Sequence, residues 1–178
     1  KVGRPLSPQL LMANRSVFER DIDEMVAIGH APTGLKGLLN QGSIATFTLG
    51  TKVAGGLTWG TIALPNATGP EMAADILGIA ADLVEGSKGV IGRARILIPL
   101  EQYNLAAVTK MSATGEETVL SYVKRVAQDA DNGSGIIESI RSWWRCKGAG
   151  AGATNRMVAY DPNEDHLGLI LPMEFNMQ

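Results

Sequence analysis

The sequence predicts an α+β fold in which a mixed β-sheet is flanked by helices. Segments with helical periodicity alternate with short apolar, β-branched runs, and this alternation does not form a regular βαβ series. The chain has 178 residues, of which 45% are hydrophobic and 19% are charged. This composition is typical of a globular domain with a substantial core.

The first predicted helix runs from Ser7 and Pro8 to about Ile28. The Ser7 hydroxyl can accept a hydrogen bond from a free backbone N–H, and the φ of proline suits the first helical turn. Gly29 is the expected left-handed end of this helix. An apolar stripe on one face comprises Leu11, Phe18, Ile22 and Met25.

Residues 30–70 are rich in glycine, threonine and proline, so we expect loops and a small hairpin there. Two β-like runs, 44–49 and 57–64, are the candidate hairpin strands. A second helix is predicted from Gly69 to Gly86, because proline and glutamate follow Gly69 in the first turn. Its inward face is expected to carry Met72, Ile76, Ile79 and Leu83.

The sequence after Gly86 predicts further short elements. Strands are expected at 94–98, 136–144, 156–160 and 167–171, and helices at 99–108 and 115–128. The inward face of the last helix should carry Val119, Leu120, Val123 and Val126. Trp143 and Trp144 would point to opposite sides of a strand, so one should join the core and the other should be available for a subunit contact.

The glycine-alanine run at 148–155 resembles a phosphate-binding loop. Such a loop needs its glycines at the N-terminus of a helix, where free N–H groups meet the anion. Here the run leads into the predicted strand 156–160, which ends at Asp161 and Pro162. We therefore predict a mobile connection between strands that holds no ligand.

Other matches to catalytic or metal-binding patterns are incomplete. Ser121 and Lys124 have the serine-lysine spacing of acyl enzymes, but neither Ser-Asp-Asn nor Lys-Thr-Gly occurs in the chain. The two histidines, His30 and His166, have no partners at metal-ligand spacing. The sequence therefore predicts no catalytic, cofactor-binding or metal-binding residues.

Two further features allow alternative interpretations. Residues 129–133 open like a calcium loop, but Ile140 occupies the position of the bidentate glutamate, which favours a turn. Cys146 lies between Arg145 and Lys147, whose charges could lower the pKa of its thiol. With no histidine near in sequence, a buried and unreactive thiol is the default expectation.

Charge and cysteine content limit the classes of function. The 16 basic and 18 acidic residues give a net charge of −2, which argues against tight nucleic-acid binding. One cysteine cannot form an internal disulfide, and no leader-like segment opens the chain, so we expect synthesis in a reducing cytoplasm. No apolar run approaches the roughly 20 residues that span a bilayer.

Several segments, in this order, resemble one protein family. They are 34–40, 95–109, 117–120, 147–150, Asp161 with Pro162, and 170–175. The chain resembles the major capsid proteins of tailed bacteriophages, with the fold named after phage Hong Kong ninety-seven. The resemblance is to a prophage branch known as a domain of unknown function.

This resemblance implies a structural subunit of a phage or prophage capsid shell, located in the virion and synthesised in the bacterial cytoplasm. Its partners would be copies of itself in pentamers and hexamers, with DNA enclosed but not specifically bound, and with no membrane or small-molecule substrate. Residues 1–33 would form the spine helix of the peripheral domain. Residues 34–178 would form the axial domain, truncated before the final peripheral strands.

Two alternatives remain open at this point. One is the shell protein of an encapsulin-type compartment on the same fold. The other is a small α/β enzyme that uses the glycine run or Ser121 and Lys124. A shell domain should lack a deep pocket with converging polar groups at either place, and the apolar stripe of its first helix should contact another chain.

Overall fold

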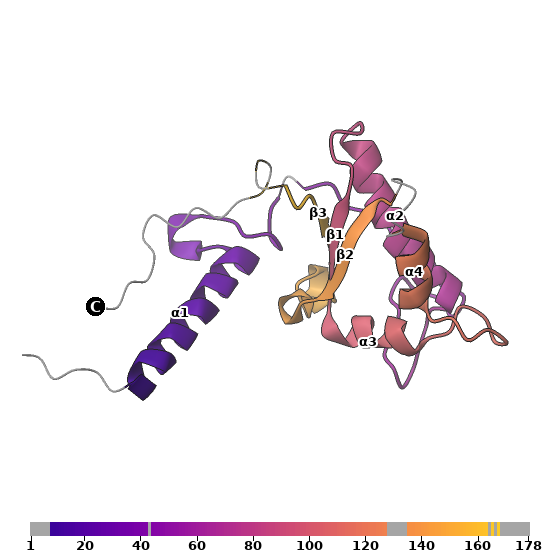
Figure 1. Cartoon of the computed structure of the whole chain (residues 1–178), viewed down its shortest axis with the longest axis horizontal. Coiled ribbons are helices and arrows are strands. Elements are labelled where there is room, and N and C mark those ends of the chain that lie inside the picture. The colour runs from indigo at the N-terminus through magenta and orange to yellow at the C-terminus, as the bar shows by residue number, and fades with distance from the viewer. Residues whose placement is uncertain (1–7, 43, 128–134, 164, 166, 168–178) are drawn as a thin grey trace, which may run out of the picture. The chain divides into compact units, whose positions relative to one another are not determined.

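The structure is a computed structural model that describes residues 8–42, 44–127, 135–163, 165 and 167 (Figure 1). Ser7, residues 129–133, His166 and most of the predicted strand 167–171 lie outside the described residues. The chain divides into two compact units, and the boundary in the sequence falls between Ile44 and Ala45. We describe each unit by itself.

The first unit consists of helix α1, Pro8–Ile28, and the segment that follows it. Gly29 ends the helix with a φ of 78°, as predicted, because glycine adopts this left-handed conformation without strain. The chain then folds back, and the N–H groups of Leu38 and Leu39 donate to the helix carbonyls of Val26 and Ala27, both at 2.8 Å. The last carbonyls of α1 thus find partners that the helix itself cannot supply.

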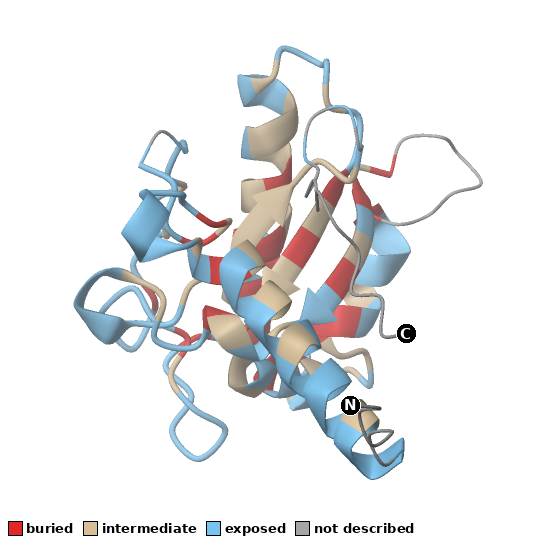
Figure 2. Cartoon of the chain, turned by 90° about the vertical axis from the view of Figure 1, so that its left-hand side faces the viewer, coloured by how far each residue is buried: buried red, intermediate tan, exposed pale blue. Residues whose placement is uncertain are grey.

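Figure 2 shows most of α1 as exposed or intermediate in the single chain. Within this fully described helix, Ala27 is the one buried residue. In the predicted apolar stripe, Leu11, Phe18 and Ile22 are half-buried, whereas Met25 is 39% exposed. The stripe is therefore an apolar face with incomplete cover.

The second unit is built on a three-stranded sheet with the order β2-β1-β3. Its strands are β1 (Ala94–Ile98), β2 (Ile137–Ser142) and β3 (Val158–Tyr160). Strand β1 pairs with β2 in parallel and with β3 in antiparallel orientation, which confirms the predicted mixed sheet. Ile98 pairs with Ser142 and Leu97 with Val158, so β1 and β2 end, and β3 begins, at the same end of the sheet. We call this end the carboxyl end.

The helices of this unit are α2 (Gly69–Gly86), α3 (Leu100–Val108) and α4 (Val119–Ala127). Figure 1 shows α2 and α4 on the same side of the sheet. Alternate residues of β1 point into the core that these helices cover, as the period of two requires. The largest fully buried side chains there are Met72, Ile76, Ile96, Ile98, Leu105, Val119, Val123 and Ile137.

Several sequence predictions need correction in the second unit. Helix α4 begins at Val119 instead of residue 115, because residues 110–118 form a loop closed by hydrogen bonds from Met111 N to Glu117 O and from Val119 N to Thr109 O. Val126 was predicted to face inward but is 46% exposed. Nine residues give only two and a half turns, so α4 presents a narrow inward face.

The runs 44–49 and 57–64 form no strands among the described residues. The second run contains a tight turn instead, with an isolated bridge between Gly60 and Pro65. Likewise, the predicted strand 136–144 ends at Ser142, and Trp144–Cys146 forms a short 3₁₀ helix. In both places, contacts with other segments of the chain replace the pairing of strands.

Candidate functional site

A loop lies along α2 and leads to the carboxyl end of the sheet. Phe47 packs against Gly78, Lys52 contacts Asp75, and the Val53 N–H donates to Glu71. These contacts follow each other in reverse order along α2, so the loop runs antiparallel to the helix. We call residues 47–61 the α2-bound loop.

The centre of this contact is a buried ion pair. Lys52 Nζ lies 2.8 Å from Oδ1 and 2.7 Å from Oδ2 of Asp75, and Trp59 Nε1 donates to Oδ2 at 2.6 Å. Lys52 and Asp75 are each 4% exposed, and Trp59 is 6% exposed. Because a buried charge is costly without a partner, this pairing holds the loop and the indole in one position.

Sequence reasoning missed all three residues of this cluster. Asp75 lies between Met72 and Ile76, on the face of α2 that we predicted to be inward. An acidic residue at a core position of a helix was the available signal, because such a residue is rarely buried unless it is paired. Its partners, Lys52 and Trp59, come from a segment without periodicity, so the pairing could not be inferred.

A second carboxylate on α2 holds the same loop one helical turn earlier. Glu71 accepts hydrogen bonds from the Thr68 N–H at 2.7 Å, the Thr68 hydroxyl at 2.8 Å and the Val53 N–H at 2.7 Å. The bond from the Thr68 N–H is the main cause that lowers the pKa of Glu71 below its ordinary value. Glu71 thus joins the start of α2 to the α2-bound loop.

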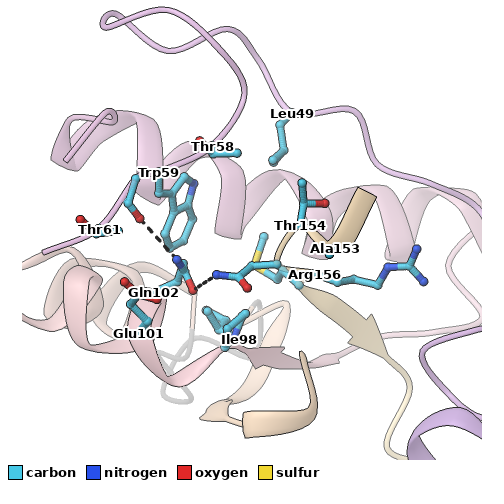
Figure 3. Close-up of a pocket in the computed structure, with 14 residues that line it drawn as sticks. Leu49, Thr58, Trp59, Thr61, Ile98, Glu101, Gln102, Ala153, Thr154 and Arg156 are labelled. Atoms are coloured by element: carbon cyan, nitrogen blue, oxygen red, sulfur yellow. Dashed lines mark hydrogen bonds between the residues drawn. The ribbon is translucent and has the colours of Figure 1, made fainter. Parts of the chain in front are cut away.

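A cavity of about 350 Å³ opens at the carboxyl end of the sheet (Figure 3). Its walls come from the α2-bound loop, from the junction of β1 with α3, and from the segment before β3. The lining residues are Leu49, Thr58–Thr61, Ile98, Pro99, Glu101, Gln102 and Ala153–Met157. The Trp59 ring that Asp75 positions is one of these walls.

Side-chain amides connect the three walls of the cavity. Gln102 Nε2 donates to the Gly60 carbonyl at 3.4 Å, and Asn155 Nδ2 donates to Gln102 Oε1 at 2.8 Å (Figure 3). The Gly148 N–H in turn donates to Asn155 Oδ1 at 3.1 Å. The cavity is therefore held open by hydrogen bonds between segments that are far apart in the sequence.

The glycine-alanine run connects β2 to β3, as predicted, and no helix follows it. It forms a turn in which the Gly150 N–H donates to the Thr154 carbonyl at 2.7 Å. However, its last three residues line the cavity beside polar side chains, contrary to the expectation that no pocket would open there. The turn brings them to the carboxyl end of the sheet, which local sequence could not indicate.

The other sequence candidates lie outside the cavity. Ser121 and Lys124 are exposed on α4, as predicted for Lys124, and neither lines the cavity. His30 is exposed and contacts Thr33 Oγ1 through Nδ1 at 3.0 Å. Cys146 is buried, and burial raises the pKa of its thiol to about 11, which favours the unreactive interpretation.

No cluster of three or more histidine, cysteine, aspartate or glutamate side chains suited to a metal ion occurs in the described part of the chain. Among the helices with described residues, none is both long and apolar enough to cross a membrane.

An exposed tryptophan lies beside this site at the end of β2. Trp143 is half-buried, and its N–H donates to the Ile98 carbonyl at 2.9 Å. Trp144 is 58% exposed, and the Arg145 guanidinium lies 4.1 Å from the centre of its ring. Trp144 is thus the outward one of the two indoles, whereas Trp143 is half-buried instead of joining the core as predicted.

Comparisons with known proteins agree with the resemblance seen in the sequence. The family model described as "Major capsid protein" matches residues 1–178. Among solved structures, the capsid of Myoviridae phage XM1 matches with a TM-score of 0.65 and 22% identity, over 87% of this chain and 48% of that chain. The chain thus spans about half the length of that capsid protein, and the likeness shows a shared fold. No curated protein matches this chain.

Proposed function

The chain belongs to the major capsid protein family, and on this premise we propose that it is a structural subunit of a phage or prophage capsid shell. The observation that carries the proposal is the family match over residues 1–178. The α+β fold with its mixed sheet, which resembles the phage XM1 capsid, agrees with it.

The proposal extends to assembly and location. Copies of the chain form pentamers and hexamers in a virion shell that encloses DNA without binding it specifically. The chain is synthesised in the bacterial cytoplasm. Residues 1–33 act as the spine helix and residues 34–178 as the axial domain. A net charge of −2 is compatible with this arrangement, because a shell that gripped DNA would need a basic surface.

The exposed apolar face of α1 supports self-association. Leu10, Val17 and Ile28 are 51%, 58% and 45% exposed, and their spacings of seven and eleven residues align them on one face of the helix. They form a second apolar row about 100° around the helix from the half-buried stripe that includes Leu11 and Phe18. Exposed apolar side chains that gather on a helix mark interaction sites more often than free surface.

A structural role without catalysis fits the exposure of Ser121 and Lys124. A catalytic lysine is usually desolvated so that its pKa falls, and it must lie within hydrogen-bond reach of the nucleophile. Both side chains are exposed instead. We therefore propose no residue of this chain as an acid, a base or a nucleophile.

Self-association of the purified chain tests the proposal. Sedimentation velocity and negative-stain electron microscopy should show rings or shell fragments that grow with protein concentration. The double variant Leu10→Ser/Val17→Ser should shift the distribution toward monomer, whereas the control Gln9→Ser, at an exposed position away from both apolar faces of α1, should not. A wild-type chain that stays monomeric throughout would contradict the proposal.

A further inference from the structure

Two distinct features lie at the carboxyl end of the sheet. The first is the turn with Trp144, which continues from the edge strand β2. The second is the cavity, whose wall at residues 153–157 leads into β3, the other edge strand. The two are neighbours, because the Arg156 N–H at the cavity wall donates to the Cys146 carbonyl of the turn at 2.9 Å, but Trp144 does not line the cavity of its own chain.

The Trp144 turn has the properties of a docking side chain. The indole is largely exposed, and the stacked Arg145 guanidinium adds a positive charge beside it. The turn is held in place, because the Trp143 N–H bonds to β1 and the Cys146 N–H donates to the Trp143 carbonyl at 3.1 Å. Tryptophan and arginine are the residues most enriched at the energetic centres of protein interfaces.

The cavity complements this turn in apolar character and in charge. Its apolar walls come from Trp59, Ile98, Pro99 and Met157. Hydrogen bonds of the Gln102 side-chain amide connect these walls and keep the cavity open. Its rim carries one carboxylate, that of Glu101. The other charged lining residue, Arg156, extends its guanidinium away from Glu101 and Gln102 (Figure 3).

We propose that the cavity receives Trp144 of a second copy of this chain, with Arg145 of that copy beside Glu101. This inference rests on the proposed function and specifies one contact within it. Because different residues form the turn and the cavity, a contact that uses the turn of one subunit and the cavity of the next is head-to-tail. Each subunit can therefore donate one tryptophan and accept another, and such contacts close into rings when the rotation allows.

Two variants test this assignment, because each of them removes one half of the contact. Trp144→Ala removes the docking side chain, and Thr58→Trp fills the cavity from an exposed lining position. Each variant alone should associate roughly 30-fold more weakly than wild type, as expected for loss of a central tryptophan. Mixed in equal amounts, they should form heterodimers through the one contact that remains intact, and this contact should build nothing larger. Circular dichroism and urea unfolding verify that each variant is folded.

Charge reversal provides a second, independent test. Arg145→Glu and Glu101→Arg should each weaken association, and the double variant should recover most of it. Unchanged association in all variants would overturn this contact and leave the shell function standing, whereas a monomeric wild-type chain would argue against the shell function itself. Loss of association with Trp144→Ala but not with Thr58→Trp would place the tryptophan elsewhere. A small molecule seen by native mass spectrometry, and displaced by Thr58→Trp without any effect on association, would assign the cavity to a ligand instead.

Discussion

Removal of the charge on Asp75 is expected to destabilise the second unit strongly. Asp75→Asn keeps the shape of the side chain but leaves the Lys52 ammonium without a counter-charge at a site that is 4% exposed. The new amide group also brings donors to a site where Lys52 and Trp59 already donate. Breaking one partner of a buried ion pair costs about 3–5 kcal/mol, so we expect a loss of that size in the free energy of unfolding.

Urea unfolding followed by far-UV circular dichroism measures this loss. Lys52→Met should also destabilise the chain, but the double variant Lys52→Met/Asp75→Asn should be more stable than the sum of the two losses predicts. The coupling should lie between about 0.5 and 3 kcal/mol, the range for residues in contact. The matched control is Lys110→Met, which breaks an exposed pair with Glu116 and should change stability by no more than about 1 kcal/mol.

Two outcomes would refute this reasoning. If Asp75→Asn cost less than about 1 kcal/mol, the buried charge of Lys52 would have to be compensated in another way. If the two single losses were additive, Lys52 and Asp75 would not act as a pair. Either result would mean that the Lys52–Asp75 ion pair is not what holds the Trp59 ring in position.

The remaining predictions concern the start of α2, the helix α4 and the acid side of the pH range. Gly69→Ala should destabilise by about 1–3 kcal/mol, because a Cβ there would overlap the backbone at residues 110 and 111, whereas the control Gly86→Ala, which has open space, should cost far less in urea unfolding. Ser121→Ala and Lys124→Ala should each change the unfolding free energy by no more than about 0.5 kcal/mol, since both positions are exposed; a larger loss would point to a buried role. The Glu71 carboxylate has a lowered pKa when folded, so its stabilising effect is complete above the unfolded pKa of 4.5 and is lost as the pH falls through the folded pKa. Wild type and Glu71→Gln should therefore differ in stability at pH 7 and converge in acid, and a difference that is independent of pH would contradict this cause.

Local chemistry determined the regular elements of this chain. Helix α1 ends at Ile28 because Gly29 adopts a positive φ, and α2 begins at Gly69 because proline and Glu71 suit its first turn. Strand β1 was predicted with its observed bounds, since four apolar residues and one arginine lie between a glycine-rich turn and a proline. The family resemblance was also visible in the sequence, because it depends on motifs and their order.

Only the tertiary structure decided the site at the carboxyl end of the sheet. The cavity joins residues 49–61, 98–102 and 153–157, and no periodicity or spacing relates these segments to one another. They meet because the β2-β1-β3 order places the ends of β1 and β2 and the start of β3 together, and because Asp75 positions the Trp59 ring. Such pairings depend on strand order and on buried charges that find partners far along the chain. A sequence pattern reports neighbours within a few residues, so it located α1, α2 and β1 but could not indicate which distant segments an element will meet.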